Sequence, residues 1–392
     1  IEQRITTWVE QRLSTYIDEL TQLCAIECPT SSKAGVDAAG AWVREWATRH
    51  GLEVTSWPQT LVGDSVMVSL RGNGKTHVLL AAHLDTVYEV GTAAARPVRQ
   101  EGNKLLGPGT ADNKSGLLSG LYSLLVLREL GMLDTIGVAS VFCGGDEETT
   151  MDSFVTIMND LAPQYHVALV LEAGRENGDI VRARKGGGGF VLETHGRAAH
   201  AGVEPEKGAH AILAMAHYIV ALQALNGLRP GVTVNVGVVE GGSVPNAVPD
   251  HARALIDARV VQPEDVEVVT AAIKAACSQQ VVPGVRSSLQ GSFRFGPMAT
   301  TPSIAALAGL AAQIAVELGF TVGAAATGGI SYANHLATLG LPVVDGLGPV
   351  GGLDHSPQEY IDQTTIVPRT AMLSALVARC SEVIGISPRD FA

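Results

Sequence analysis

The chain has 392 residues, 46% of them hydrophobic and 44 of them glycine, which predicts a large buried core and two domains. Its formal charge of -12, from 27 Lys and Arg against 39 Asp and Glu, argues against a nucleic-acid or anionic-membrane partner, because either would need a basic face. No apolar stretch reaches the roughly 18 to 20 residues of a membrane span, so we expect a small metabolite or peptide as the partner.

The first residues lack the pattern of a signal peptide, which favours a cytoplasmic location. Because the sequence starts at Ile1, removal of a leader stays open as an alternative, and with it a periplasmic location. The cysteines are too few and scattered for a disulfide framework, so we expect reduced thiols in apolar surroundings. They are Cys24, Cys28, Cys143, Cys277 and Cys380.

In chain order, helical and extended apolar patterns alternate through the first half of the sequence. Helices are predicted over residues 5–23, 36–50, 115–130 and 152–161. Strands are predicted over residues 65–70, 77–82, 136–143 and 167–171. This alternation predicts an α/β sheet with helices on both faces, whose ligand site lies beyond the carboxyl ends of the strands.

The glycine-rich run Lys185–Gly189 marks a change of pattern and a predicted hinge. The elements that follow read β-α-β-β-α-β, a ferredoxin-like unit: residues 190–195, 207–225, 233–240, 252–260, 264–279 and 285–289. We interpret this unit as an inserted domain of residues 187–296, with residues 1–186 and 297–392 forming the first domain. The last elements complete the outer sheet: residues 303–318, 320–325, 333–339, 342–345 and 367–384.

Metal-ligand side chains recur just after the apolar runs, at the predicted ligand edge of the sheet. They are His83, Asp112, Glu148, Glu172 and His355. Imidazole and carboxylate ligands without thiolate suit zinc, with cobalt or manganese as alternatives. Two such ions can share a hydroxide during hydrolysis, and Asp112, in a glycine-flanked loop, is the expected bridge between them.

Two adjacent acids, Glu147 and Glu148, suit different roles, because neighbouring side chains in an irregular loop point in different directions. One can hold a metal while the other acts as general base toward the attacking water. The alternative is a helix N-terminus that favours acids through its dipole. That alternative does not account for the other ligand-type residues.

These motifs resemble those of the di-zinc metallopeptidase family of glutamate carboxypeptidases, aminoacylases and dipeptidases. Within it the chain looks most like the bacterial folate-cleaving glutamate carboxypeptidases. The matching motifs cover nearly the whole chain: His83-x-Asp85-Thr-Val, Gly107-Pro-Gly-x-x-Asp112-x-Lys114-x-Gly116, Asp146-Glu147-Glu148, Glu172, Gly196-x-x-x-His200-Ala-Gly202 and His355. The resemblance implies a zinc-peptidase-like, doubly wound mixed sheet with an inserted ferredoxin-like lid and dimerisation domain.

The resemblance further implies two zinc ions per subunit. One would be held by His83, Asp112 and Glu172, and the other by Asp112, Glu148 and His355. Asp112 would then bridge the ions.

Other residues carry roles only through this resemblance. Glu147 would be the general base, and Asp85 would orient His83. The inserted domain would form a homodimer, in which His200, supported by Asn246, reaches the oxyanion in the neighbouring subunit's site.

Arg259 and Arg294 would bind a substrate carboxylate through paired hydrogen bonds. For both arginines a surface ion pair is the alternative. For His200 the alternative is a loop histidine with no role.

Three segments depart from the family pattern. Asn113–Ser115 replaces Met-Lys-Gly or Asp-Lys-Gly after the bridging acid, and Thr149–Ser153 replaces a Gly-Ser pair after the catalytic acids. Tyr332 stands where relatives have an aspartate that lines the substrate pocket. We therefore expect Tyr332 to line that pocket, and we do not carry over glutamate specificity.

The sequence thus predicts a two-zinc hydrolase that cleaves the amide bond to a C-terminal amino acid of a small peptide. An aminoacylase acting on N-acyl amino acids with the same metals is the alternative. A non-catalytic metal-binding homologue is the third interpretation.

Overall fold

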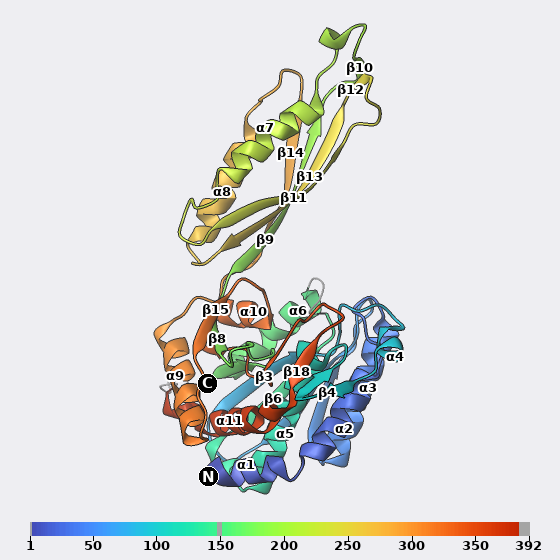
Figure 1. Ribbon diagram of the computed structural model, residues 1–392. Coiled ribbons are helices and arrows are strands. Elements are labelled where there is room, and N and C mark those ends of the chain that lie inside the picture. Colours follow the sequence, from blue (N-terminus) through green and yellow to red (C-terminus); the bar gives the residue numbers. More distant parts are fainter. Residues whose placement is uncertain (1, 147–150, 384–392) are drawn as a thin grey trace. The chain divides into compact units, whose positions relative to one another are not determined.

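The computed structural model describes residues 2–146 and 151–383, which form two compact units (Figure 1). Unit 1 comprises Ile1–Arg182, Thr300–Ala326 and Ser331–Ala392, and unit 2 comprises Ala183–Ala299 and Thr327–Ile330. Among the described residues, no helix is long and apolar enough to cross a membrane.

Unit 1 is built on a six-stranded mixed sheet in the order β1-β2-β6-β3-β7-β16. The strands from β6 to β16 are parallel, whereas β1 and β2 are antiparallel to their neighbours. Their bounds are β1 Glu53–Trp57, β2 Ser65–Arg71, β3 His77–His83, β6 Val138–Gly144, β7 Val167–Val170 and β16 Val343–Val344. Parallel strands are buried on both faces, which explains the unbroken apolar run that ends at His83.

Helices cover both faces of this sheet. On β6, Val141 and Cys143 join the main core, while Phe142 packs on the opposite face against Phe154 and Tyr332. The helices with residues in the main core are α1 Glu2–Glu10, α2 Leu13–Cys24, α3 Lys33–Arg49, α5 Ser115–Glu129, α9 Pro302–Glu317 and α11 Ile366–Arg379. Those on the opposite face are α6 Asp152–Leu161 and α10 Tyr332–Thr338. The predicted mixed α/β sheet with helices on both faces is confirmed.

A smaller sheet in unit 1, ordered β17-β18-β5-β4, joins two loops that are far apart in the sequence. Its strands are β4 Arg99–Glu101, β5 Lys104–Leu106, β17 Gly351–Gly352 and β18 Tyr360–Asp362. The loop with Asp112 follows β5, and His355 lies between β17 and β18. The pairing of β18 with β5 therefore brings these two loops together. The remaining unit 1 elements include α4 Thr92–Ala95 and the pair β8 Ile180–Arg184 and β15 Ala324–Thr327.

Unit 2 has an antiparallel sheet in the order β11-β13-β9-β14, with two helices packed on one face. Its elements are β9 Gly186–His195, α7 Ala211–Gln223, β11 Thr233–Gly241, β13 His251–Val260, α8 Asp265–Ser278 and β14 Arg286–Phe295. Burial alternates along β13, so that one face packs on the helices and the other is exposed. Two short strands, β10 Ala199–His200 and β12 Ala247–Val248, pair beyond this sheet. The predicted β-α-β-β-α-β order is confirmed.

The glycine run that was predicted to mark a hinge lies within a regular strand. Gly186–Gly189 is the first part of β9, paired with β13 on one side and β14 on the other. A Cβ atom on Gly188 would lie 3.0 Å from the ring of Phe293, so glycine there lets this ring pack on the strand. The glycines therefore serve close packing within the sheet. The helix predicted over residues 5–23 is also two helices, α1 and α2.

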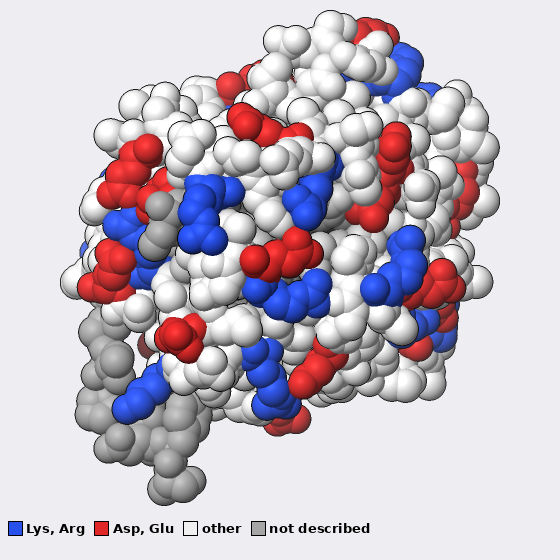
Figure 2. All heavy atoms as spheres, turned by 90° about the horizontal axis from the view of Figure 1, so that it is seen from below, with Lys and Arg blue, Asp and Glu red and all other residues white. Residues whose placement is uncertain are grey.

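Charged side chains of both signs are interspersed over the face of the molecule shown in Figure 2. No continuous basic patch is visible on the described part of that face, in keeping with the excess of acidic residues.

Candidate active site

His83 ends β3 and is fully buried. Its Nδ1 lies 2.9 Å from the backbone oxygen of Asp85 and 3.4 Å from the Asp85 carboxylate. That carboxylate accepts a 2.5 Å hydrogen bond from the hydroxyl of Thr30. These contacts orient the imidazole so that Nε2 is the nitrogen directed to the other site residues.

The carboxylate of Asp112 lies between two histidines. Its Oδ1 is 3.1 Å from His83 Nε2, and its Oδ2 is 3.0 Å from His355 Nε2. Glu172 Oε1 lies 3.9 Å from the same nitrogen of His83. One oxygen toward each histidine is the arrangement expected of a carboxylate that bridges two cations.

Close packing at the start of α5 places Glu172 beside this bridge. A Cβ atom on Gly116 would lie 1.8 Å from the backbone oxygen of Leu171, so only glycine permits this approach. The side chain of Asn113 then donates a 2.6 Å hydrogen bond to Glu172. The motif glycine thus acts through packing.

The electrostatics match this geometry. Burial raises the pKa of Asp112, but the hydrogen bonds from His355 and His83 outweigh it and hold the pKa well below its usual range. Burial lowers the pKa of His83, yet hydrogen bonds to Asp112 and Asp85 raise it overall, well above its ordinary value. The site therefore stabilises positive charge between its acids.

Two groups of ligand atoms meet at Asp112. His83, Asp112 and Glu172 form one group, and Asp112, Asp354 and His355 form the other, with the atoms of each group within 4.8 Å of one another. Imidazole nitrogens and carboxylate oxygens in both groups suit zinc, cobalt or manganese. The described residues thus fit divalent metal ions. Asp354, next to His355 in sequence, was not among the predicted ligands.

Glu147 and Glu148 lie outside the described residues. The preceding Asp146 is buried, and its Oδ2 accepts backbone hydrogen bonds of 2.7 Å from Ser153 and 3.4 Å from Phe154 at the start of α6. Burial raises the pKa of Asp146. Asp146 thus links the residues after β6 to the start of α6.

Tyr332 is buried and offers no surface to a substrate. Its side chain is 0% exposed and stacks on Phe154 with ring centroids 3.6 Å apart. Its hydroxyl is 3.5 Å from Asp146 Oδ1. Our expectation that Tyr332 lines the substrate pocket is corrected, because the ring occupies a buried position between α6 and β6.

Glu359 is a site residue that the sequence analysis missed. Its buried carboxylate accepts hydrogen bonds from the backbone N–H groups of Gly109, Ala111 and Asp112, at 2.8 to 3.0 Å, and from the hydroxyl of Tyr88 at 2.6 Å. Glu359 follows His355 by four residues, so it joins the two loops that carry Asp112 and His355. That short spacing is the only signal the sequence offers.

The remaining predicted residues belong to unit 2. His200 and Asn246 lie in neighbouring segments, since β10 pairs with β12 and the N–H of Ala201 donates to the Asn246 carbonyl at 3.0 Å. Arg259 binds Asp257 on the same strand through two hydrogen bonds of 2.8 Å. Arg294 lies with its guanidinium carbon 5.8 Å from the centre of the Phe295 ring.

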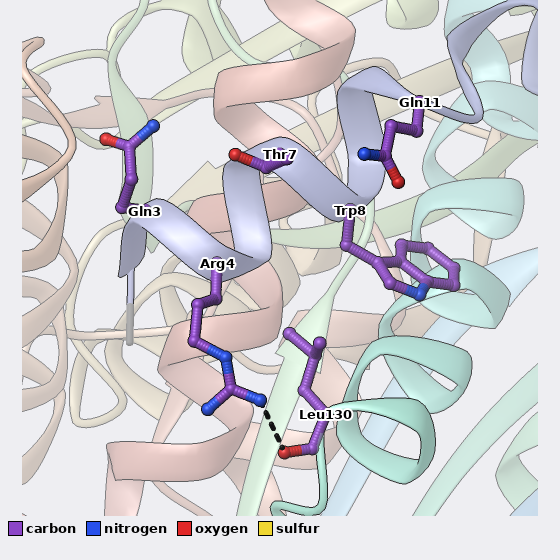
Figure 3. A pocket seen from close by; sticks show the side chains of 6 residues that line it. All are labelled: Gln3, Arg4, Thr7, Trp8, Gln11 and Leu130. Carbon is purple, nitrogen blue, oxygen red and sulfur yellow. Dashed lines mark hydrogen bonds between the residues drawn. The ribbon is translucent and has the colours of Figure 1, made fainter.

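A shallow hollow on the outer side of α1 carries no acid and no histidine (Figure 3). In it, Arg4 donates to the backbone oxygen of Leu130 at 3.4 Å. Because it lacks metal-ligating groups, the hollow is unsuited to the predicted chemistry.

Residues 182–285 match the M20 peptidase dimerisation domain. The chain is 28% identical over 371 residues to carboxypeptidase G2 from Pseudomonas sp. (strain RS-16), covering 92% of this chain and 88% of the relative. These matches show that the chain is similar to the M20 peptidases, and they indicate a metal-dependent peptide hydrolase, as predicted.

Solved structures of other proteins share the fold of this chain. Aminopeptidase PepT from Bacillus cereus superposes with a TM-score of 0.81 at 22% identity, covering 94% of this chain and 99% of its own. The M20 metallo-carboxypeptidase Sso-CP2 from Sulfolobus solfataricus gives 0.74 at 17% identity, covering 93% and 98%. The dimerisation-domain match also suggests oligomerisation.

Proposed function

We propose that this protein cleaves the amide bond to the C-terminal amino acid of a small peptide, and that Asp112 is one of the residues that would hold two zinc ions. The observation that carries the proposal is the Asp112 carboxylate, with one oxygen toward His83 and the other toward His355. The similarity to carboxypeptidase G2 supports the choice of a C-terminal amino acid. The side chain of that amino acid stays undefined.

Five side chains would hold the ions: His83, Asp112, Glu148, Glu172 and His355. When bound, two divalent ions polarise the scissile carbonyl and lower the pKa of the attacking water. Asp85 and Glu359 keep His83 and the Asp112 loop in place through the contacts described above.

Glu147 would move the proton. It takes a proton from the attacking water and later delivers it to the leaving nitrogen, so that the amine departs neutral. The preceding Asp146, whose carboxylate is bound to the backbone at the start of α6, supports this role.

Unit 2 would complete the site as a homodimer. Exposed apolar side chains on α7 and on β11 at the sheet edge support a dimer contact there. They include Leu213, Val220, Val238 and Val239, which are 48%, 72%, 45% and 53% exposed. In the dimer, His200 with Asn246 would stabilise the oxyanion in the partner's site. Arg294 or Arg259 would bind the substrate carboxylate, which for Arg259 requires exchange of its bond to Asp257.

The variant Glu147→Gln tests the mechanism. It removes the base and keeps the shape of the side chain, so kcat should fall by about 10³-fold while the metal content stays unchanged. The matched control is Glu176→Gln, which changes an acid on the loop after β7 and should leave the enzyme's activity unchanged. Substantial turnover by Glu147→Gln would contradict the mechanism.

Substrate class is tested separately with dipeptides and N-acyl amino acids. A carboxypeptidase should accept aminoacyl and peptidyl groups on the acyl side of the scissile bond, whereas an aminoacylase should hydrolyse the N-acyl amino acids alone. The second outcome would replace the proposed substrate and keep the metal chemistry.

A further inference from the structure

The exposed face of the unit 2 sheet carries two histidines and a glutamate that the proposed mechanism does not use. Glu193 and His195 lie on β9, and His251 lies on β13. One ligand atom from each residue lies within 4.8 Å of the other two. The two helices of unit 2 cover the opposite face of this sheet, so the cluster faces outward.

Strand register explains why these side chains converge. His195 and His251 are directly opposite each other. The N–H of Gly196 donates to the carbonyl of Asp250 at 2.7 Å, which makes the histidines a non-hydrogen-bonded pair, the kind whose side chains lie closest. Their ring centroids are 5.1 Å apart.

Glu193 precedes His195 by two residues and so projects from the same face. Its Oε2 lies 3.6 Å from His195 Nε2, and its Oε1 lies 3.9 Å from His251 Nε2. The two imidazole nitrogens are thus directed to one carboxylate.

We propose that Glu193, His195 and His251 form a metal site that binds a divalent transition-metal ion, with Zn²⁺ as the reference ion. Metal–ligand bonds of roughly 2.0 to 2.2 Å place neighbouring ligand atoms of a tetrahedral zinc site about 3.4 Å apart. The separations of 3.6 and 3.9 Å reach that spacing by small side-chain rotations. Imidazole ligands favour zinc, copper or nickel over magnesium and calcium, which prefer oxygen.

The surroundings set the expected strength of binding. The side chains of His195, His251 and Glu193 are 53%, 48% and 34% exposed, so an ion can reach them from solvent. In the strand register, Arg253 lies beside Glu193 and Arg286 beside His195, and their positive charges oppose a cation. A micromolar dissociation constant follows for this site, weaker than that of a buried metal centre.

Because of the position of the cluster, a bound ion should restrain the ends of two strands. His195 is the last residue of β9 and His251 the first of β13, so an ion here ties these strands where the segments of His200 and Asn246 leave the sheet. Binding should therefore slow local opening of residues 196–200 and 246–250. The importance of that effect for catalysis rests on the role proposed above for His200, whereas the metal site itself does not.

Zinc counting on the full chain tests the site. Purified protein is equilibrated with buffered Zn²⁺ at rising free concentration, and bound zinc per chain is measured by mass spectrometry of the metal. Wild type should bind one equivalent more than His195→Asn/His251→Asn at micromolar free zinc. Glu240→Gln removes one negative charge from the same sheet face, beside Arg253, and should bind as wild type does.

Two results would overturn the site. One is equal zinc content in wild type and the double histidine variant, and the other is an equal loss in Glu240→Gln, which would show a general charge effect. Glu193→Gln provides a second variant with both histidines intact and should weaken the same binding step. Catalytic turnover at low zinc should be unchanged in all of these variants, so failure of this site leaves the proposed peptidase mechanism untouched.

Discussion

The two units hold their candidate functional residues in opposite ways. In unit 1, His83, Asp112 and Asp85 are buried or nearly so and are fixed by hydrogen bonds to one another and to the backbone. In unit 2, His200 and Asn246 lie on short paired segments at the surface. The contrast teaches that the candidate metal ligands are preorganised within one unit, whereas the substrate contacts proposed for unit 2 would depend on dimer assembly.

A charge placed among the buried residues of unit 1 should have the largest effect, and that effect should be on stability. Tyr332→Asp places an unpaired carboxylate in a fully buried position against Phe154 and should lower the free energy of unfolding by about 3 kcal/mol. Tyr332→Phe keeps the ring packing and should leave both stability and KM nearly unchanged. Urea denaturation and steady-state kinetics check both variants, and a large KM change in Tyr332→Phe would restore a direct substrate role.

The role proposed for His200 of unit 2 is tested by mixing subunits. His200→Ala should lower kcat by about 10²-fold, because a stabilising donor to the oxyanion is lost. Mixed dimers of His200→Ala with Glu147→Gln should regain activity, since one of their two sites would contain both intact residues. No gain in verified mixed dimers would show that His200 does not act across the dimer.

Variants of Glu359 test whether the hydrogen bonds that hold the Asp112 loop also support metal binding. Glu359→Gln replaces an acceptor of three backbone N–H groups with an amide and should weaken metal affinity 10- to 100-fold. Tyr88→Phe removes one donor to the same carboxylate and should have a smaller effect. Chelator competition measures the affinity, and kcat should recover at saturating metal; a kcat loss that metal does not restore would point to a different role.

The smallest expected effect lies far from the site, where Arg379 joins helix ends through Glu2, Glu317 and Glu382. Hydrogen bonding to Arg379 lowers the pKa of Glu317 below its ordinary value of 4.5. A lowered carboxyl pKa stabilises the fold above pH 4.5, and this contribution is lost as pH falls through the folded-state pKa. Arg379→Met should therefore lower Tm slightly at pH 7 and have less effect in acid. Arg4→Met is the control, and an equal Tm difference at both pH values would contradict the assignment.

The parts of this account that the sequence could predict are those with a local pattern. The apolar run before His83 predicts a buried strand with a ligand at its end, and the glycines around Asp112 predict a tight loop. Glu359 has no such pattern, because its partners lie about 250 residues away on the other loop. The burial of Tyr332 depends on stacking with Phe154 and on the missing side chain of Gly144, contacts that arise only in the folded chain. The close packing of the glycine run in β9 could not be predicted for the same reason, since its close neighbours come from other strands.

The central claim is that Asp112 bridges two metal ions, and metal content tests it most directly. After equilibration at nanomolar free zinc, too low to fill the weaker site on unit 2, wild type should hold two ions per chain. Asp112→Asn should lose both ions with its fold intact. One ion or fewer in the wild-type protein, or two ions retained by Asp112→Asn, would contradict the account.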